Sequence, residues 1–68
     1  MYRRREYLAG GSIEIIDDAY FTEFGFTYRT QMFVDGRAYS DHYRTVPAED
    51  APTFDELMSN GYDIEPHM

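Results

Sequence analysis

The clearest pattern in the sequence is an alternation of apolar and polar residues over positions 24–34. Phe26, Tyr28 and Met32 fall on one side of this alternation. A period of two residues is typical of a β-strand with one buried face. Asp35-Gly36 follows at once, and this dipeptide tolerates the positive φ angles of a two-residue type I′ turn. The sequence therefore predicts a β-hairpin centred on residues 35–36.

The returning segment, residues 37–45, also alternates and fixes the expected register of the hairpin. With two loop residues, Met32 lies opposite Tyr39 and Tyr28 lies opposite Tyr43. Both tyrosines are then predicted to face the core together with Phe26. The other face of the hairpin is expected to carry Arg29, Phe33, His42 and Arg44.

Upstream of the hairpin, residues 12–17 contain three isoleucines and predict another strand. Asp17-Asp18-Ala19 is expected to form the turn into the long strand, which then begins near residue 20. Gly25 inside that strand indicates a bulge or a bend. Residues 1–8 alternate weakly and fit either an edge strand or a frayed basic arm, and the glycine pair at 10–11 interrupts whatever precedes it.

The C-terminal part of the chain carries the signals of a short helix. Residues 46–52 contain two prolines and two acids and are expected to form a loop. Thr53 is the expected N-cap, Glu56 its capping-box partner and Gly61 the stop. Residues 62–65 alternate briefly and are expected to add a short edge strand. The apolar stripe expected to lie on the sheet is Phe54, Leu57 and Met58.

Together these elements predict one α+β domain over residues 1–68. It consists of an antiparallel meander of three or four strands, with one short helix packed on one face. A chain of this length is near the lower limit for a single hydrophobic core. It has no cysteine, so disulfides and thiolate metal sites are excluded. A second copy would add buried surface, and both a monomer and a homodimer stay open.

Charge is the unusual property of the chain. Thirteen acids and six arginines give a net charge of −7, and there is no lysine. Residues 45–68 hold six of these acids and no arginine, so this segment alone carries −6. Charge of this kind governs partners and association rates rather than fold. The predicted partner-binding residues are Glu49, Asp50, Asp55, Glu56, Asp63 and Glu65, with Asp17, Asp18 and Glu23 as a second cluster at the opposite end of the sheet.

Residues that would support catalysis are sparse. The three serines lack a local base or nucleophile elbow. Asp41 and His42 are neighbours on a strand, so their side chains point to opposite faces. Asp63, Glu65 and His67 alternate as metal ligands can, but the penultimate residue of a chain is expected to fray. We therefore expect no enzymatic activity, no metal site and no cofactor.

Membrane and nucleic-acid partners are both disfavoured. No apolar run approaches the ~20 residues that span a bilayer, and no secretory signal is recognisable, so a cytoplasmic protein is expected. The net negative charge repels nucleic acid, although Arg3 to Arg5 and the hairpin aromatics keep a small nucleic-acid-binding module as one alternative. The other alternative is a dimerising structural or accessory protein with an aromatic interface that includes Phe21 and Phe33.

In size, in its lack of cysteine and lysine, and in its acidic C-terminal third, the chain resembles the small phage-encoded inhibitors. These include anti-CRISPR proteins, anti-restriction proteins and other DNA mimics. The resemblance implies a non-enzymatic protein that blocks a nucleic-acid-binding surface of a host complex, for example a CRISPR effector, in the host cytoplasm. Carboxylates two residues apart on a strand lie ~6.6 Å apart, and each DNA strand presents a phosphate every ~3.4 Å. A surface of fixed carboxylates can therefore fit a groove that binds phosphates.

Overall fold

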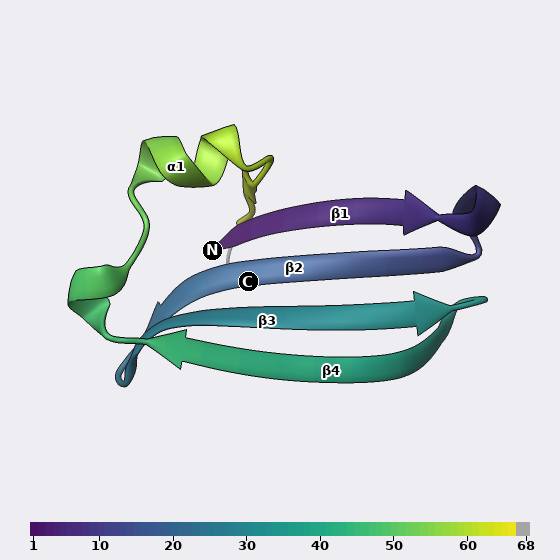
Figure 1. Ribbon diagram of the computed structural model, residues 1–68, viewed down its shortest axis with the longest axis horizontal. Coiled ribbons are helices and arrows are strands. Elements are labelled where there is room, and N and C mark those ends of the chain that lie inside the picture. The colour runs from purple at the N-terminus through teal and green to yellow at the C-terminus, as the bar shows by residue number, and fades with distance from the viewer. Residues whose placement is uncertain (67–68) are drawn as a thin grey trace.

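The computed structural model describes residues 1–66 and contains one five-stranded antiparallel sheet and one short α-helix (Figure 1). The strands lie in the order β4-β3-β2-β1-β5, so the first four form a meander and the last returns to pair with β1. An antiparallel sheet with one short helix is confirmed, with one or two strands more than predicted. The elements are β1 (Tyr2–Leu8), η1 (Ala9–Gly11), β2 (Ile13–Thr22), β3 (Gly25–Val34), β4 (Arg37–Val46), η2 (Ala48–Asp50), α1 (Phe54–Ser59) and β5 (Asp63–Ile64).

The turn expected at Asp17-Asp18-Ala19 is wrong, because β2 runs straight through these residues. The arginines of β1 explain this difference. Arg4 lies opposite Asp17 and Arg3 lies opposite Asp18, so each carboxylate inside the strand has a cationic partner. These partners come from residues that the sequence left open between an edge strand and a frayed arm. β1 is in fact an inner strand, lying between β2 and β5.

The turn between β2 and β3 lies instead at residues 23–24. The Thr22 hydroxyl accepts a hydrogen bond from the backbone N–H of Phe24 at 3.2 Å. Gly25 then begins β3 with φ +136°, and a Cβ at this position would collide with the carbonyl oxygen of Val46. Only glycine allows the start of β3 to approach the end of β4 this closely.

The type I′ hairpin turn is confirmed, with φ angles of +52° at Asp35 and +78° at Gly36. The first pairs after it also follow the predicted register, but the pairing then shifts by one residue. Phe33 lies opposite Ala38 and Met32 lies opposite Ser40, so Tyr39 is the extra residue of a β-bulge. The expected pair of Met32 with Tyr39 is therefore wrong.

This bulge moves every later side chain of β4 to the face opposite the predicted one. Tyr28 lies opposite Arg44 instead of Tyr43, and His42 lies opposite Thr30. Tyr39 and Tyr43 are 74% and 61% exposed, so their predicted places in the core are wrong. His42 and Arg44 share the face of Tyr28, which is the face that α1 covers.

The buried core is small and lies at one end of the sheet. Its apolar members are Ala19 and Phe26 from the sheet, Leu57 from α1 and Tyr62 from the segment after α1. The predicted helix signals are confirmed: Thr53 and Glu56 form a reciprocal capping box, and the helix ends before Gly61. Because a helix of six residues is not stable alone, these sheet contacts hold it in place.

α1 lies near one end of the sheet, and within residues 1–66 no α-helix packs over the far half (Figure 1). The molecule is accordingly elongated, measuring 37 × 22 × 22 Å. Its radius of gyration is 12.8 Å, whereas a compact domain of this length has about 11 Å. Within residues 1–66, no helix has the length and apolarity that crossing a membrane requires.

Candidate functional site

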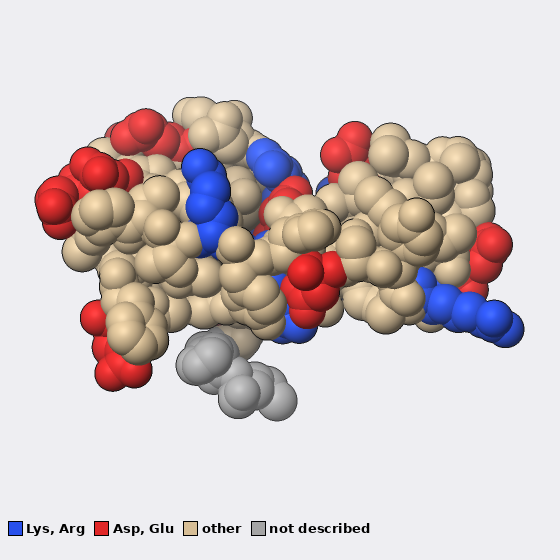
Figure 2. Space-filling model, turned by 60° about the horizontal axis from the view of Figure 1, so that its bottom comes forward, with Lys and Arg blue, Asp and Glu red and all other residues tan. Residues whose placement is uncertain are grey.

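The candidate site is a group of exposed carboxylates at the end of the molecule that carries η2 and α1. We call this surface the acidic end. Figure 2 shows carboxylates gathered at this end, whereas most of the arginine side chains visible in that view lie nearer the middle. The β2–β3 turn belongs to the same end, because Gly25 is packed against the Val46–Ala48 backbone that leads into η2. The acidic end consists of Glu23, Glu49, Asp50, Asp55 and Glu56, all exposed.

Local sequence places these carboxylates on turns rather than along a strand. Glu49 and Asp50 lie in the single 3₁₀ turn that follows Pro47. Asp55 and Glu56 lie in the first turn of α1, where negative charge interacts favourably with the helix dipole. Glu56 also accepts hydrogen bonds from the backbone N–H of Thr53 at 3.2 Å and from its hydroxyl at 3.1 Å. The regular strand spacing considered for phosphate mimicry therefore does not apply to this group.

Exposed phenylalanines accompany the carboxylates. Phe24, in the β2–β3 turn beside Glu23, is 79% exposed, and Phe21 and Phe54 are exposed as well. Sequence reasoning missed this feature, because it assigned Phe24 to a long strand and Phe54 to the buried stripe of the helix. Aromatic side chains within a charged surface are typical of binding interfaces, where they become buried against a partner.

Asp17 and Asp18 do not belong to this surface. The Asp18 side chain is only 5% exposed and accepts hydrogen bonds from Arg3 at 2.6 and 3.0 Å. Asp17 accepts two hydrogen bonds from Arg4, at 3.1 and 3.3 Å, and one from the Thr30 hydroxyl at 2.7 Å. Both carboxylates are thus hydrogen-bonded to neighbouring residues of the sheet. The expected second cluster does not form, because Glu23 lies at the acidic end and not with these two residues.

Asp63 lies in β5 and Glu65 just after it, at the edge of the sheet beside β1. Asp63 lies opposite Arg3, and the backbone N–H of Glu65 donates to the Met1 carbonyl at 2.8 Å. The pKa of Arg3 is raised, chiefly by its hydrogen bond to Asp18 and further by the charges of Asp18 and Glu65. The positive charge of Arg3 therefore partly offsets the negative charge of this edge.

The alternating Asp63, Glu65 and His67 set cannot be assessed as a metal site, because His67 lies outside the described residues. Within residues 1–66, no three His, Asp or Glu side chains are close enough together to hold a metal ion.

The three ion pairs found in residues 1–66 all lie within the sheet and none at the acidic end. The third joins Arg29 to Asp41 by hydrogen bonds of 3.0 and 2.7 Å on the face away from α1. This contact raises the pKa of Arg29 and lowers the pKa of Asp41. Half of the arginines thus pair with sheet aspartates, and no arginine within residues 1–66 forms an ion pair with a carboxylate of the acidic end.

Comparison with known proteins gives no match: no family model, no curated protein and no solved structure matches the chain. The surface of this molecule is therefore the basis on which we infer its function.

Proposed function

We propose that the protein is a non-enzymatic binding protein whose acidic end docks on a basic surface of a host protein or nucleoprotein complex. The concrete form of the proposal is a phage-type inhibitor, of the anti-CRISPR or anti-restriction kind, that excludes nucleic acid by presenting similar charge. One observation carries it: five exposed carboxylates lie at one end of the molecule, and the ion pairs of residues 1–66 lie elsewhere.

Long-range attraction and local anchoring would act together at such an interface. The uncompensated charge attracts a basic groove over about 10 Å at 0.1 M salt and speeds the encounter. Phe24 and Phe54 then supply apolar area, which gains free energy when a partner covers it. Arginines of the partner can pair with Glu23 or Asp55 and stack on the neighbouring ring faces. Because the carboxylates lie on turns, the surface imitates the charge density of DNA and not a regular phosphate spacing.

A matched pair of variants tests this proposal. Glu23→Gln/Glu49→Gln/Asp50→Asn removes three charges from the acidic end and leaves the capping box intact. The control, Glu6→Gln/Glu14→Gln/Asp35→Asn, removes three charges elsewhere. The assay measures how each protein releases labelled duplex DNA from purified DNA-binding host complexes, including a CRISPR effector.

The acidic-end variant is expected to lose at least tenfold in inhibition, whereas the control stays within about twofold of the wild type. Raising the salt concentration from 50 to 300 mM should weaken wild-type inhibition steeply, because ions screen exposed charges. Equal losses in the two variants would contradict the proposal, since net charge rather than this surface would then determine binding.

The uncovered half of the sheet supports a second candidate function, a dimerising structural or accessory protein. Tyr7, Leu8 and Tyr39 are exposed at this half, which no α-helix of the described part of the chain covers. Sedimentation equilibrium separates the two candidates, because a tight homodimer that Tyr39→Glu disrupts would favour the second. The nucleic-acid-binding alternative loses support, since Arg3 and Arg4 are engaged in ion pairs within the sheet.

A further inference from the structure

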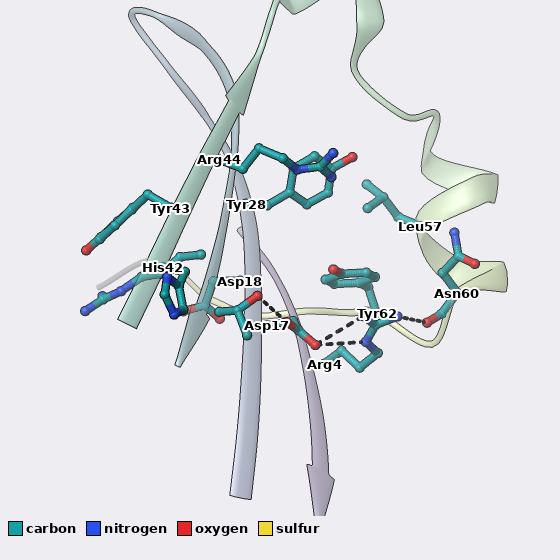
Figure 3. A pocket seen from close by; sticks show the side chains of 12 residues that line it. Arg4, Asp17, Asp18, Tyr28, His42, Tyr43, Arg44, Leu57, Asn60 and Tyr62 are labelled. Carbon is teal, nitrogen blue, oxygen red and sulfur yellow. Dashed lines mark hydrogen bonds and ion pairs between the residues drawn. The ribbon is translucent and has the colours of Figure 1, made fainter. Parts of the chain in front are cut away.

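A pocket of about 400 Å³ lies between the α1 side of the sheet and the segment that follows α1 (Figure 3). This volume is within the range of small-molecule sites, roughly 300–1,000 Å³. Leu57 and Tyr62 supply its apolar wall, and strands of the sheet supply its polar side. The charged side chains that line the pocket on the α1 face are Arg4, Arg44 and Asp17, which give it a net charge of +1 in a protein of net charge −7.

Arg4 forms a fixed part of the pocket. Its guanidinium carbon lies 4.6 Å from the centre of the Tyr62 ring. The same group donates to the Asn60 carbonyl at 2.9 Å and to Asp17 at 3.1 and 3.3 Å. Arg4 thereby ties the segment after α1 to the sheet and neutralises Asp17. It holds the pocket in shape but has little capacity left for a ligand.

Arg44 is different, because it has neither an ion pair nor a hydrogen bond with any residue in the range 1–66. Its guanidinium carbon lies 4.6 Å from the centre of the Tyr28 ring, so the group is oriented by stacking alone. Stacking uses the flat face of a guanidinium and leaves its N–H edge free. His42 lies two residues earlier on the same face of β4, about 7 Å away along the strand. Two nitrogen-bearing side chains thus border the same side of the pocket.

The apolar side of the pocket can accommodate the aromatic ring of a ligand. In Figure 3 the Arg44–Tyr28 stack and the Tyr62 ring lie on facing sides, with Leu57 beside them. The Tyr62 hydroxyl is protonated at neutral pH, as any tyrosine is, and can donate a hydrogen bond; burial raises its pKa further. A ligand that enters here therefore meets the exposed parts of Tyr62 and Leu57, which are 8% and 3% exposed, on one side and the free guanidinium of Arg44 on the other.

We propose that this pocket binds a small aromatic oxyanion, a ring that carries a carboxylate or a phosphate, independently of the acidic end. Arg44 binds two oxygens of the anion through its N–H edge, and His42 provides a second donor. The ring of the ligand packs against Tyr62 and Leu57. Asp17 does not repel the anion strongly, because Arg4 and the Thr30 hydroxyl already hold its charge.

An NMR titration of the full chain at low salt tests this inference. The probes are phenyl phosphate, benzoate, inorganic phosphate and benzylammonium, and the signals are the Arg44 Nε–H and the rings of Tyr28 and Tyr62. Phenyl phosphate or benzoate is expected to give saturable shifts. Arg44→Gln should weaken this binding at least tenfold and Arg44→Lys less, since lysine keeps the charge without the two-pronged geometry. The matched control is Arg37→Gln, an exposed arginine beside the hairpin turn and outside the pocket, which should stay within twofold.

Several outcomes would overturn the inference. These are the absence of saturable shifts with both aromatic anions, equal losses in Arg44→Gln and Arg37→Gln, or equally tight binding of benzylammonium. Inorganic phosphate binding as tightly as phenyl phosphate would refute the role of the ring. If the Arg44→Gln variant no longer shows the spectrum of the folded sheet, the test uses His42→Ala, which changes an exposed residue. A threefold loss of affinity for phenyl phosphate, roughly, would then support the site, and an unchanged affinity would overturn it.

Discussion

Two arginine–aspartate pairs on the same face of the sheet have the same two-bond geometry but different burial. Arg3 binds Asp18 at 2.6 and 3.0 Å, with side chains 24% and 5% exposed. Arg29 binds Asp41 at 3.0 and 2.7 Å, with side chains 32% and 42% exposed. If the loss of stability on breaking such a pair depends on burial, Arg3→Met should lower the free energy of unfolding much more than Arg29→Met.

The expected size of the difference follows from the solvation of the remaining carboxylate. Arg3→Met leaves the charge of Asp18 buried without its main partner, and breaking a buried pair in this way costs about 3 kcal/mol. Arg29→Met leaves Asp41 in water, where exposed pairs contribute little. The double variant Arg3→Met/Asp18→Asn removes the buried charge as well, so it should regain much of the lost stability.

Urea unfolding followed by circular dichroism measures these effects. With a slope of about 1 kcal/mol per M urea, the Arg3→Met midpoint should fall by roughly 3 M. Because a domain of this size has only ~3–5 kcal/mol to lose, the titration should start from trimethylamine N-oxide, which stabilises the folded state. Equal midpoints for Arg3→Met and Arg29→Met, or a double variant no more stable than Arg3→Met, would refute the reasoning.

Three further predictions test the fold. Gly25→Ala should destabilise the protein by more than ~2 kcal/mol in urea, because the added Cβ meets the backbone of Val46, whereas Gly36→Ala meets no atom and should lose only about 1 kcal/mol from its positive φ. The raised pKa of Tyr62 means that its protonated form stabilises the fold below pH 10 and that this contribution is lost as the pH rises through the folded pKa. The urea midpoint should therefore fall above pH 10, and less so in Tyr62→Phe than in the control Tyr39→Phe. Deletion of Tyr39 should keep every other pair of β3 with β4, as cross-strand nuclear Overhauser effects will show, and a changed register would contradict the bulge.

Local signals explain what the sequence predicts correctly. The side chains of Thr53 and Glu56 each accept a hydrogen bond from the backbone N–H of the other across the first helical turn. Asp35 and Gly36 supply both positive φ angles of the hairpin turn. Each of these features depends on residues within a few positions. The helix start and the hairpin tip are therefore confirmed as predicted.

Long-range contacts explain what the sequence does not show. Asp17-Asp18 looks like a turn, but arginines 13 and 15 positions away hold it in a strand. The bulge at Tyr39 contains no glycine and has no local signature, yet it reverses the faces of His42 and Arg44. The pocket that Arg4 and Arg44 line depends on that reversal. For this reason the alternation pattern alone places Arg44 on the wrong face.

The proposal that the acidic end is the binding surface can be tested most directly by site-specific photo-crosslinking. A benzophenone side chain replaces Phe24 at the acidic end in one protein and Tyr39 at the uncovered half of the sheet in another. Both proteins are irradiated in host lysate with and without excess duplex DNA. The account predicts that crosslinks from position 24 join nucleic-acid-binding proteins and disappear with DNA, while position 39 gives none. Crosslinks that arise only from position 39, or that persist from position 24 in excess DNA, would contradict it.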